Sequence, residues 1–262
     1  KTEIIVTKNH HAEIRKVTFK NESEEVKKLQ LTTYTEPILA ENMADVSHRT
    51  FNNMFIHSNY DKKTNSLVVR RKSRGESNIS SYMINRLVIE NPMEEFSYET
   101  ERSRFVGRNK TIGNAQAMDE SLSNYVGDNL DPVMSLRNSI EIAPNSSETV
   151  YLIVGFGRSK EQIQDIVKSY STEKQIDKAF KFATLMNIMN TKNLNITGED
   201  MRVYNIMLNY LYQTTKLSVT EERMNYLRKN ALGQSGLWKF GVSGDRPIIS
   251  VEISDISDMG FV

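Results

Sequence analysis

The segment from Glu94 to Arg108 carries the side chains with the clearest chemical potential. Its carboxylates invite comparison with glycoside hydrolysis, which requires two carboxylates at a fixed separation. Its arginines, beside an aromatic ring, have the donors to grip an anion or a sugar. The set comprises Glu94, Glu95, Glu99, Glu101, Arg102, Arg104 and Arg108, with Phe105 as the ring. We favour a solvated loop whose glutamates are partly neutralised by its arginines.

The phrase "ETERSRFVGR" within this segment is expected to be extended. In an extended chain alternate side chains share a face, so Arg102 and Arg104 would project to one side and Phe105 to the other. Ion pairs with Glu99 and Glu101 across a turn are the preferred role of these arginines. An anion-binding or sugar-binding grip is the alternative.

Other residue types exclude several enzyme classes. The four histidines (His10, His11, His48 and His57) form no H-x-x-x-H pair, and the sequence has no G-x-S-x-G, Walker or G-x-G-x-x-G motif. The absence of cysteine excludes disulfides, Cys-ligated zinc and thiol nucleophiles, and it favours a cytoplasmic localisation. A net charge of +1 gives no field that would attract nucleic acid or an anionic membrane. The sequence contains no run of eighteen apolar residues, so it predicts no membrane span. We expect no metal and no cofactor.

Two further features have a structural and a functional interpretation. The basic phrase "VVRRKSRGES", with Arg70, Arg71, Lys72 and Arg74, is interpreted as the solvated end of a hairpin, with phosphate contact as the alternative. Trp238 is the only tryptophan and stands in the glycine-rich phrase "GQSGLWKFGVSGDRP". Its side chain is expected to pack at a junction between two parts of the chain. The alternative is that it lines the edge of a sugar-binding site.

The chain divides into a β-rich part and a helical part. Residues 1–157 alternate apolar and polar positions in several runs, among them "TEIIVTK" and "AEIRKVTFKN", which predict a hairpin around Asn9–His11. Further strands are expected in "EVKKLQLTTYTEPI", "SLVVRR", "YMINRLVIE", "SLRNSIEIAP" and "SETVYLIVGFG", with "SNYDKKTNS" as a turn. Many antiparallel strands predict a β-sandwich, in which the long irregular segment after Asn91 is either functional or a cover for another surface.

Residues 158–232 carry apolar residues at helical spacing behind capping signals at Ser159, Thr172 and Thr197. The second and third helices are expected to form an antiparallel hairpin, and Gly233 to end a fourth short helix. Residues 233–262 predict a loop with two tight glycine turns, followed by a strand in "IISVEISD".

Five phrases in order along the chain resemble glycoside hydrolase family 94. They are "LTTYTEPILAENMADVSHRTFNNMFI", "ETERSRFVGR", "DPVMSLRNSIEIAP", "SKEQIQDIVKSY" and "GQSGLWKFGVSGDRPIISV". The phrase "ETERSRFVGR" most resembles the β-1,2-glucan members, which include 1,2-β-oligoglucan phosphorylase and the phosphorylase-like module of cyclic β-1,2-glucan synthase. The resemblance implies a supersandwich-like β-domain over residues 1–157, begun inside the sandwich. It implies a helical linker over 158–232 and a junction over 233–262 that leads to a catalytic barrel.

The same resemblance implies the chemistry of the parent protein. Such phosphorylases invert configuration, with one aspartic acid protonating the leaving oxygen and inorganic phosphate as the attacking co-substrate. That acid lies in the barrel, so we expect no catalytic residue in this chain. The residues expected to reach the active-site region are Arg104, Phe105, Arg108 and Trp238. The implied partners are a β-glucan oligosaccharide, glucose 1-phosphate or phosphate, the barrel and a second copy in a homodimer. A free-standing carbohydrate-binding or assembly module is the alternative function.

Overall fold

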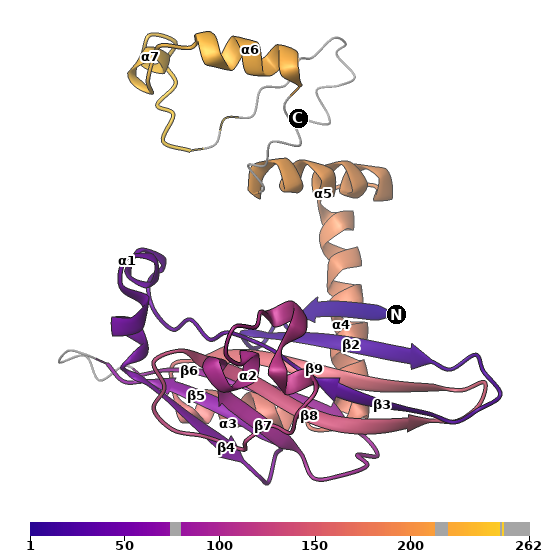
Figure 1. Ribbon diagram of the computed structural model, residues 1–262. Coiled ribbons are helices and arrows are strands. Elements are labelled where there is room, and N and C mark those ends of the chain that lie inside the picture. Colours follow the sequence, from indigo (N-terminus) through magenta and orange to yellow (C-terminus); the bar gives the residue numbers. More distant parts are fainter. Residues whose placement is uncertain (74–79, 213–219, 247, 249–262) are drawn as a thin grey trace. The chain divides into compact units, whose positions relative to one another are not determined.

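The computed structural model describes residues 1–73, 80–212, 220–246 and 248, and the chain forms two compact units, Lys1–Ile188 and Met189–Val262. The first unit is mostly β-structure (Figure 1). Its strands are β1 (Thr2–Val6), β2 (Ala12–Lys20), β3 (Lys27–Thr32), β4 (Ile56–Asp61), β5 (Ser66–Arg71), β6 (Ser81–Ile89), β7 (Ser97–Glu101), β8 (Pro132–Ile142) and β9 (Ser147–Gly157). Its helical segments are α1 (Asn42–Asn53), α2 (Arg102–Val106), η1 (Ile112–Asn114), η2 (Gln116–Met118), α3 (Lys160–Ser169) and most of α4 (Glu173–Asn193).

The strands form two antiparallel sheets, which confirms the predicted β-then-α fold class. The larger sheet has six strands in the order β1-β2-β9-β6-β5-β4, and the smaller has three in the order β3-β8-β7. The predicted hairpin is β1 and β2, paired antiparallel with Ile4 opposite Arg15. Two strands differ from the sequence-based expectation: β4 occupies residues expected in part to form a turn, and β7 lies in the segment expected to be irregular.

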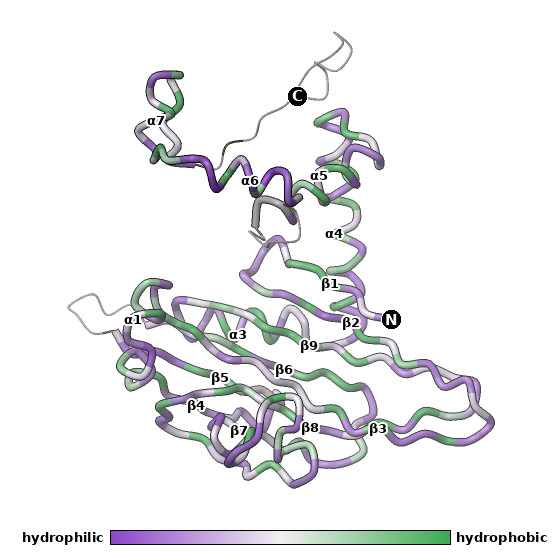
Figure 2. Tube along the Cα trace, turned by 45° about the horizontal axis from the view of Figure 1, so that its top comes forward, coloured by the Kyte–Doolittle hydropathy of each residue, from purple (hydrophilic) through white to green (hydrophobic). Residues whose placement is uncertain are grey.

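The two faces of the six-stranded sheet bury different apolar clusters. The face turned to the small sheet packs around side chains such as Leu67, Met134 and Leu136, all fully buried. The opposite face packs against α3 and the start of α4, through Ile14, Ile84, Ile153, Ile166 and Ile176. Figure 2 shows apolar positions along the neighbouring strands β9, β6 and β5. Because both faces are covered, a central strand such as β9 is apolar at adjacent positions, with the sequence VYLIVGF over residues 150–156.

The long irregular segment is a cover over the outer face of the small sheet. Phe105, Val106, Ala117 and Leu122 pack with Val133 of β8, so β8 is buried on both faces. The buried guanidinium of Arg137 fixes this cover, because its Nε donates to Thr32 Oγ1 and its Nη groups donate to the carbonyl oxygens of Ala117 and Glu120. Burial lowers the pKa of Arg137 below its ordinary value. The cover is one of the two roles expected of this segment.

The capping signals in the sequence are confirmed. Ser159 Oγ accepts from the backbone N–H of Gln162 at the start of α3, and Thr172 and Gln175 bond reciprocally at the start of α4. Thr197 and Asp200 do the same before α5 (Gly198–Tyr212). The antiparallel packing of α4 and α5 as a hairpin stays a prediction.

The C-terminal unit holds α5, α6 (Glu221–Lys229) and α7 (Ser235–Trp238). The fourth predicted helix is α6, but it ends at Lys229 and not at Gly233, because the chain becomes extended at Asn230. The loop predicted from Leu237 is wrong at its start, because Leu237 and Trp238 lie in α7. Gly241 and Gly244 have φ of 75° and 73°, in the left-handed region that glycine tolerates. The predicted strand "IISVEISD" lies, apart from Ile248, outside the described residues. Among the helices that the structure describes, none has the length and apolar character needed to cross a bilayer.

Candidate functional site

The candidate site is built where β7 ends and α2 begins. The pairing of β7 with β8 shifts register between Glu99 and Glu101, and a bulge of this kind turns a strand and re-aims its side chains. The first three residues of "ETERSRFVGR" are extended in β7, but the chain enters α2 at Arg102, so the expectation of an extended phrase is wrong from there on. The helical turn is favoured because it buries Phe105 and Val106 against β8 while its arginines remain at the surface.

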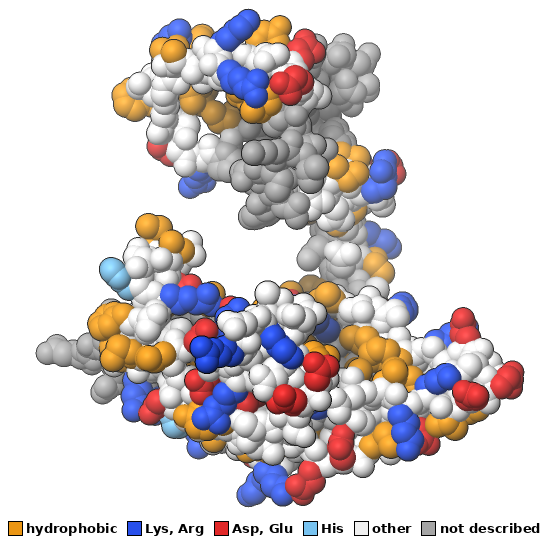
Figure 3. Space-filling view, viewed as in Figure 1, with side chains coloured by type: hydrophobic (Ala, Val, Ile, Leu, Met, Phe, Trp, Pro, Cys, Tyr) orange, Lys and Arg blue, Asp and Glu red, His pale blue; other side chains and the backbone are white. Residues whose placement is uncertain are grey.

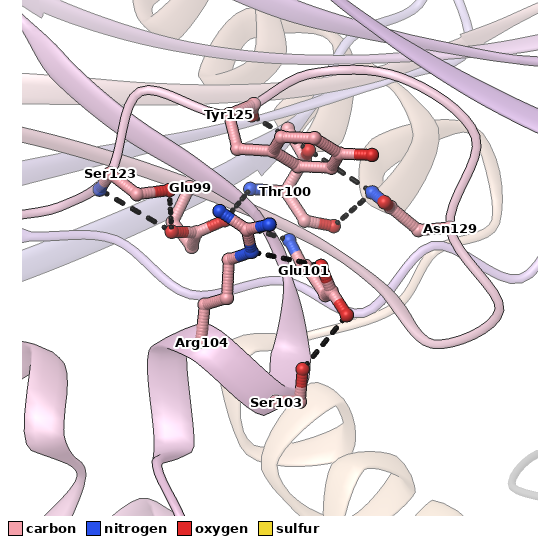
Figure 4. Close-up of polar contacts among 8 residues, drawn as sticks. All are labelled: Glu99, Thr100, Glu101, Ser103, Arg104, Ser123, Tyr125 and Asn129. Atoms are coloured by element: carbon pink, nitrogen blue, oxygen red, sulfur yellow. Dashed lines mark hydrogen bonds and ion pairs between the residues drawn. The ribbon is translucent and has the colours of Figure 1, made fainter.

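A buried carboxylate organises this corner of the fold. Glu99 is 1% exposed, and its Oε1 accepts from the backbone N–H groups of Thr100 and Glu101 at 2.9 and 3.0 Å. Its Oε2 accepts from the Ser123 hydroxyl at 2.6 Å and from the Ser123 N–H at 3.4 Å (Figure 4). A buried charge is tolerated when its acceptor sites are filled in this way. Glu99 therefore ties the bulge to the cover and does not form the expected pair with an arginine.

Thr100 fixes the next part of the cover. Its hydroxyl donates to the Tyr125 carbonyl oxygen at 2.8 Å, and the Asn129 amide donates to the Thr100 carbonyl oxygen, also at 2.8 Å. Thr100 is fully buried and Asn129 nearly so. The backbone that carries the Tyr125 ring is held by these bonds, and the ring is presented to α2 (Figure 4).

Arg104 lies over that ring. Its guanidinium carbon is 4.4 Å from the Tyr125 ring centroid, within the range of a cation–π contact. Its Nε donates to Glu101 Oε2 at 3.0 Å, and Glu101 also accepts from the Ser103 hydroxyl. The Arg104 side chain is still 49% exposed. The sequence predicts a structural ion pair for Arg104, and the geometry confirms one.

Arg102 points to a different group. Its Nε donates to Glu36 Oε1 at 3.1 Å and to the Tyr34 hydroxyl oxygen at 3.2 Å, and its Nη1 lies 3.7 Å from Asp131 Oδ2. Arg49 of α1 binds the other oxygen of Glu36 at 2.8 Å. The prediction that Arg102 and Arg104 share a face is wrong, because residues two apart in a helix do not lie side by side.

The protonation of this group follows from its contacts. The Tyr34 hydroxyl, followed by Arg49 and Arg102, holds the pKa of Glu36 below its ordinary value. Burial and the hydrogen bond to Glu36 raise the pKa of Tyr34 to about 12. Glu36 is therefore an anion and Tyr34 a neutral donor at physiological pH.

A polar cavity of about 390 Å³ opens beside this group. Its volume is in the range of small-molecule sites. Its walls come from the segment between β3 and α1, from α1, from α2 and from the segment before β8, and the lining residues are Glu36, Arg49, Thr50, Asn53, Arg102, Leu130 and Asp131. Figure 3 shows blue and red side chains interspersed on this face of the molecule. We call the surface formed by Arg49, Arg102, Arg104 and Tyr125 with Glu36, Glu101 and Asp131 the arginine surface.

In the arginine surface, the pKa of Glu36 is displaced downward, which disfavours its protonated form. Within the described residues, every carboxylate with a clearly displaced pKa is displaced downward: Glu22, Glu36, Glu161 and Asp200. A general acid requires the opposite displacement. The described residues also contain no group of three or more metal-ligating side chains.

The four residues selected from the sequence lie in different environments. Arg104 and Arg108 are at the surface, and in the described part of the chain nothing bonds to the Arg108 guanidinium. Phe105 is 3% exposed, with its ring centroid 4.8 Å from that of Tyr34. Trp238 lies in the C-terminal unit, is 63% exposed, and donates from Nε1 to the Ser243 carbonyl oxygen at 3.3 Å.

Sequence reasoning misses Tyr34, Glu36 and Tyr125, which contact the arginines of α2 from other segments. It also misses Arg49, which binds Glu36. Tyr34, Glu36 and Arg49 lie in the phrase from Leu31 to Ile56, which resembles the family. The resemblance does not single out these three residues. Tyr125 has no local signal.

Comparison with known proteins gives two findings. The family model described as "Glycosyl hydrolase 94, supersandwich domain" matches residues 1–173. The cyclic beta-(1,2)-glucan synthase NdvB of Rhizobium meliloti (strain 1021) is 29% identical over 265 residues, which covers 98% of this chain and 9% of that protein. The chain therefore spans less than a tenth of the length of this curated relative.

Proposed function

The chain belongs to the glycosyl hydrolase 94 supersandwich family, and on this premise we propose that it is the sandwich and linker part of a protein that acts on β-1,2-glucan. The parent reaction would transfer glucose reversibly between glucose 1-phosphate and the glucan, in a phosphorylase or in a cyclic glucan synthase. The likeness to a protein named as a cyclic β-(1,2)-glucan synthase supports the choice of linkage. In the parent, inorganic phosphate would be the co-substrate.

We assign the chain a supporting and binding role within that protein. Residues 1–157 would form the sandwich, 158–232 the linker and 233–262 the junction to a catalytic barrel. The lowered pKa of Glu36 supports a binding role for the arginine surface, because it disfavours the protonated form that a general acid needs. The cysteine-free sequence supports a cytoplasmic location.

Exposed apolar side chains support docking against a further domain. Met43 and Val46 of α1 are 72% and 73% exposed, and Trp238 and Phe240 of the C-terminal unit are 63% and 72% exposed. Figure 3 shows orange side chains gathered over α1. Large apolar groups at a surface mark interaction sites when they cluster. A barrel of the same protein, or a second copy of the chain, would cover them.

The single observation that carries the binding role is the Arg104–Tyr125 pair. It combines an aromatic ring and a half-exposed guanidinium on a backbone that Glu99, Thr100 and Asn129 fix through buried hydrogen bonds. Because the ring and the guanidinium are already held in place, sugar binding would not have to offset the entropy cost of ordering these side chains. Arg108 would extend this surface, and the cavity beside Arg102 would accept a glucosyl unit.

Isothermal calorimetry with sophorose, the β-1,2-linked disaccharide of glucose, tests the binding role. We expect measurable heat for sophorose, weaker heat for the β-1,4-linked cellobiose, and a loss of affinity of about tenfold in Arg104→Ala. The matched control is Arg15→Ala, which removes an exposed arginine from β2 that is likewise paired with a nearby glutamate. Equal heats for the two disaccharides, or an Arg104→Ala variant that binds as the control does, would reject the role.

A further inference from the structure

A second hollow lies on the face of the six-stranded sheet that α3 only partly covers. The helix packs on β9 and β6, where Gly155 and Gly157 leave room for it. A Cβ at Gly155 would stand 3.0 Å from methyl groups of Ile166 and Ile84, and one at Gly157 would stand 3.1 Å from Gln162 Cβ. The close approach over these glycines seats α3 toward the centre of the sheet. The same face of β5 and β4 remains open beside it.

The open face forms a groove of about 980 Å³. The pairing of the strands sets its floor in two cross-strand rows, His57–Arg70–Tyr82 and Asn59–Val68. The residues of α3 that form the wall are Lys160, Ile163, Gln164, Val167 and Lys168, and the turn after β4 adds Lys62, Lys63 and Thr64 at the rim. We call this hollow the α3 groove. It lies on the opposite face of the large sheet from the small sheet and its cover.

The α3 groove is strongly positive. Five cationic side chains line it against one carboxylate, Asp61. That carboxylate is already used, since it accepts from the Lys63 N–H at 2.9 Å and from the Thr64 hydroxyl at 3.0 Å. Lys62 pairs with Glu95 at 3.1 Å, whereas within the described residues no ion pair engages Lys63, Lys160 or Lys168. Cations gathered in a concave surface without counter-charges concentrate anions there.

Arg70 is the best-oriented of these cations. Its Nε and Nη2 both donate to the Ser80 hydroxyl oxygen, at 3.2 and 3.0 Å, and its guanidinium carbon lies 5.7 Å from the Tyr82 ring centroid. These contacts hold the guanidinium on the floor of the groove and, among the described residues, leave Nη1 for a ligand. A planar guanidinium fixed in this way matches the geometry of a phosphate group. Lys160 supplies a second charge from the opposite wall.

The rest of the groove suits a sugar ring. The Asn59 and Gln164 amides have donors and acceptors for hydroxyl groups, and Val68, Ile163 and Val167 supply an apolar floor and wall. A neutral sugar alone leaves the cations without partners, and an inorganic anion alone leaves the amides and the apolar surface unused.

We propose that the α3 groove is a binding site for a phosphorylated hexose. The phosphate would be bound by Arg70 and Lys160, and the sugar hydroxyls by Asn59 and Gln164. The anion-binding part rests on the groove alone, whereas the choice of a hexose also rests on the proposed function. The site is separate from the arginine surface and would respond to the level of a sugar phosphate.

The test is a calorimetric titration of the 262-residue chain with glucose 1-phosphate, with inorganic phosphate and glucose titrated separately. We expect glucose 1-phosphate to bind at least tenfold more tightly than either. The Arg70→Ala/Lys160→Ala variant should weaken it at least tenfold. The control is Arg15→Ala/Lys20→Ala, which removes two exposed cations from β2 and has the same net charge. Circular dichroism must show the same folded spectrum for both double variants. The Gln164→Ala variant keeps every charge and should also bind glucose 1-phosphate more weakly.

Three results would overturn the proposal. Equal weakening in the two double variants would mean a general charge effect, and equal affinity for phosphate and glucose 1-phosphate would remove the hexose. Tighter binding of an acidic peptide or of anionic lipid vesicles would assign the groove to another ligand. A failed sophorose titration with retained glucose 1-phosphate binding would reject the proposed function and leave the groove assignment standing.

Discussion

Replacing Glu99 by glutamine tests how the arginine surface is held in place. The change keeps the size of the side chain and replaces one acceptor oxygen with an NH₂ group. The oxygen that accepts from Thr100 and Glu101 can be retained. The contact with Ser123 must change, because an NH₂ group cannot accept from its N–H or from its hydroxyl.

The expected cost follows from these bonds. A hydrogen bond to a charged group contributes about 1.5–3 kcal/mol and a neutral one about 0.5–1.5 kcal/mol, so each short bond loses about 1 kcal/mol when the charge is removed. Three short bonds to Glu99 are affected, and the smaller desolvation of an amide offsets part of the loss. We expect Glu99→Gln to lower the free energy of unfolding by about 2 kcal/mol. Glu99→Ala, which leaves two backbone N–H groups and a cavity behind, should lower it by about 4 kcal/mol.

Urea unfolding followed by the circular dichroism of the β-sheets measures both variants. Glu141→Gln is the matched control, because it lies on β8 of the same sheet and its partner Lys28 is 3.6 Å away at the surface. Exposed pairs of this kind contribute less than about 1 kcal/mol. A Glu99→Gln variant as stable as Glu141→Gln would refute the reasoning that the buried carboxylate fixes the cover.

Two further predictions concern pH and packing. Because the pKa of Glu36 is lowered in the folded chain, its stabilising contribution is present above its ordinary value of 4.5 and is lost as the pH falls below it. Melting temperatures measured across that range should fall less steeply in Glu36→Gln than in the parent chain, and parallel curves would contradict this. Gly155→Ala should destabilise the chain by about 1–3 kcal/mol, because its Cβ crowds methyl groups of Ile166 and Ile84. An unchanged urea midpoint for Gly155→Ala would contradict this, because it would show that α3 can move away from the new Cβ without loss of stability.

The sequence predicts those elements whose signals are local. The β1–β2 hairpin follows from alternation around a short turn, and the starts of α3, α4 and α5 follow from capping residues. Each signal is complete within a few residues, so no knowledge of the tertiary contacts is needed.

The elements that sequence reasoning misses depend on distant contacts. The helix α2 forms in a segment with an extended pattern because burying Phe105 against Val133 of β8 outweighs the local preference. The strand β4 is hidden because His57, Asn59 and Asp61 are polar on the face that lines the α3 groove, while Ile56 alone marks the apolar face clearly. Ser58, which is 1% exposed, interrupts the buried face between Ile56 and Tyr60, so the apolar–polar alternation is incomplete.

The candidate site shows the same limit. The residue types in the segment from Glu94 to Arg108 predict ion pairs, and Arg104 with Glu101 forms one. The partners of Arg102 are not predictable, because Glu36 and Asp131 come from other segments and meet it only in the fold. The role of Glu99 as a buried acceptor likewise depends on Ser123 in the cover.

The most direct test of the proposed function is a phosphorolysis assay on the full-length gene product. The assay measures release of glucose 1-phosphate from β-1,2- and β-1,4-linked oligoglucosides, with and without inorganic phosphate. We predict phosphate-dependent release from the β-1,2-linked substrate and little from the β-1,4-linked one. Release that does not depend on phosphate, or a preference for the β-1,4 linkage, would contradict the assignment.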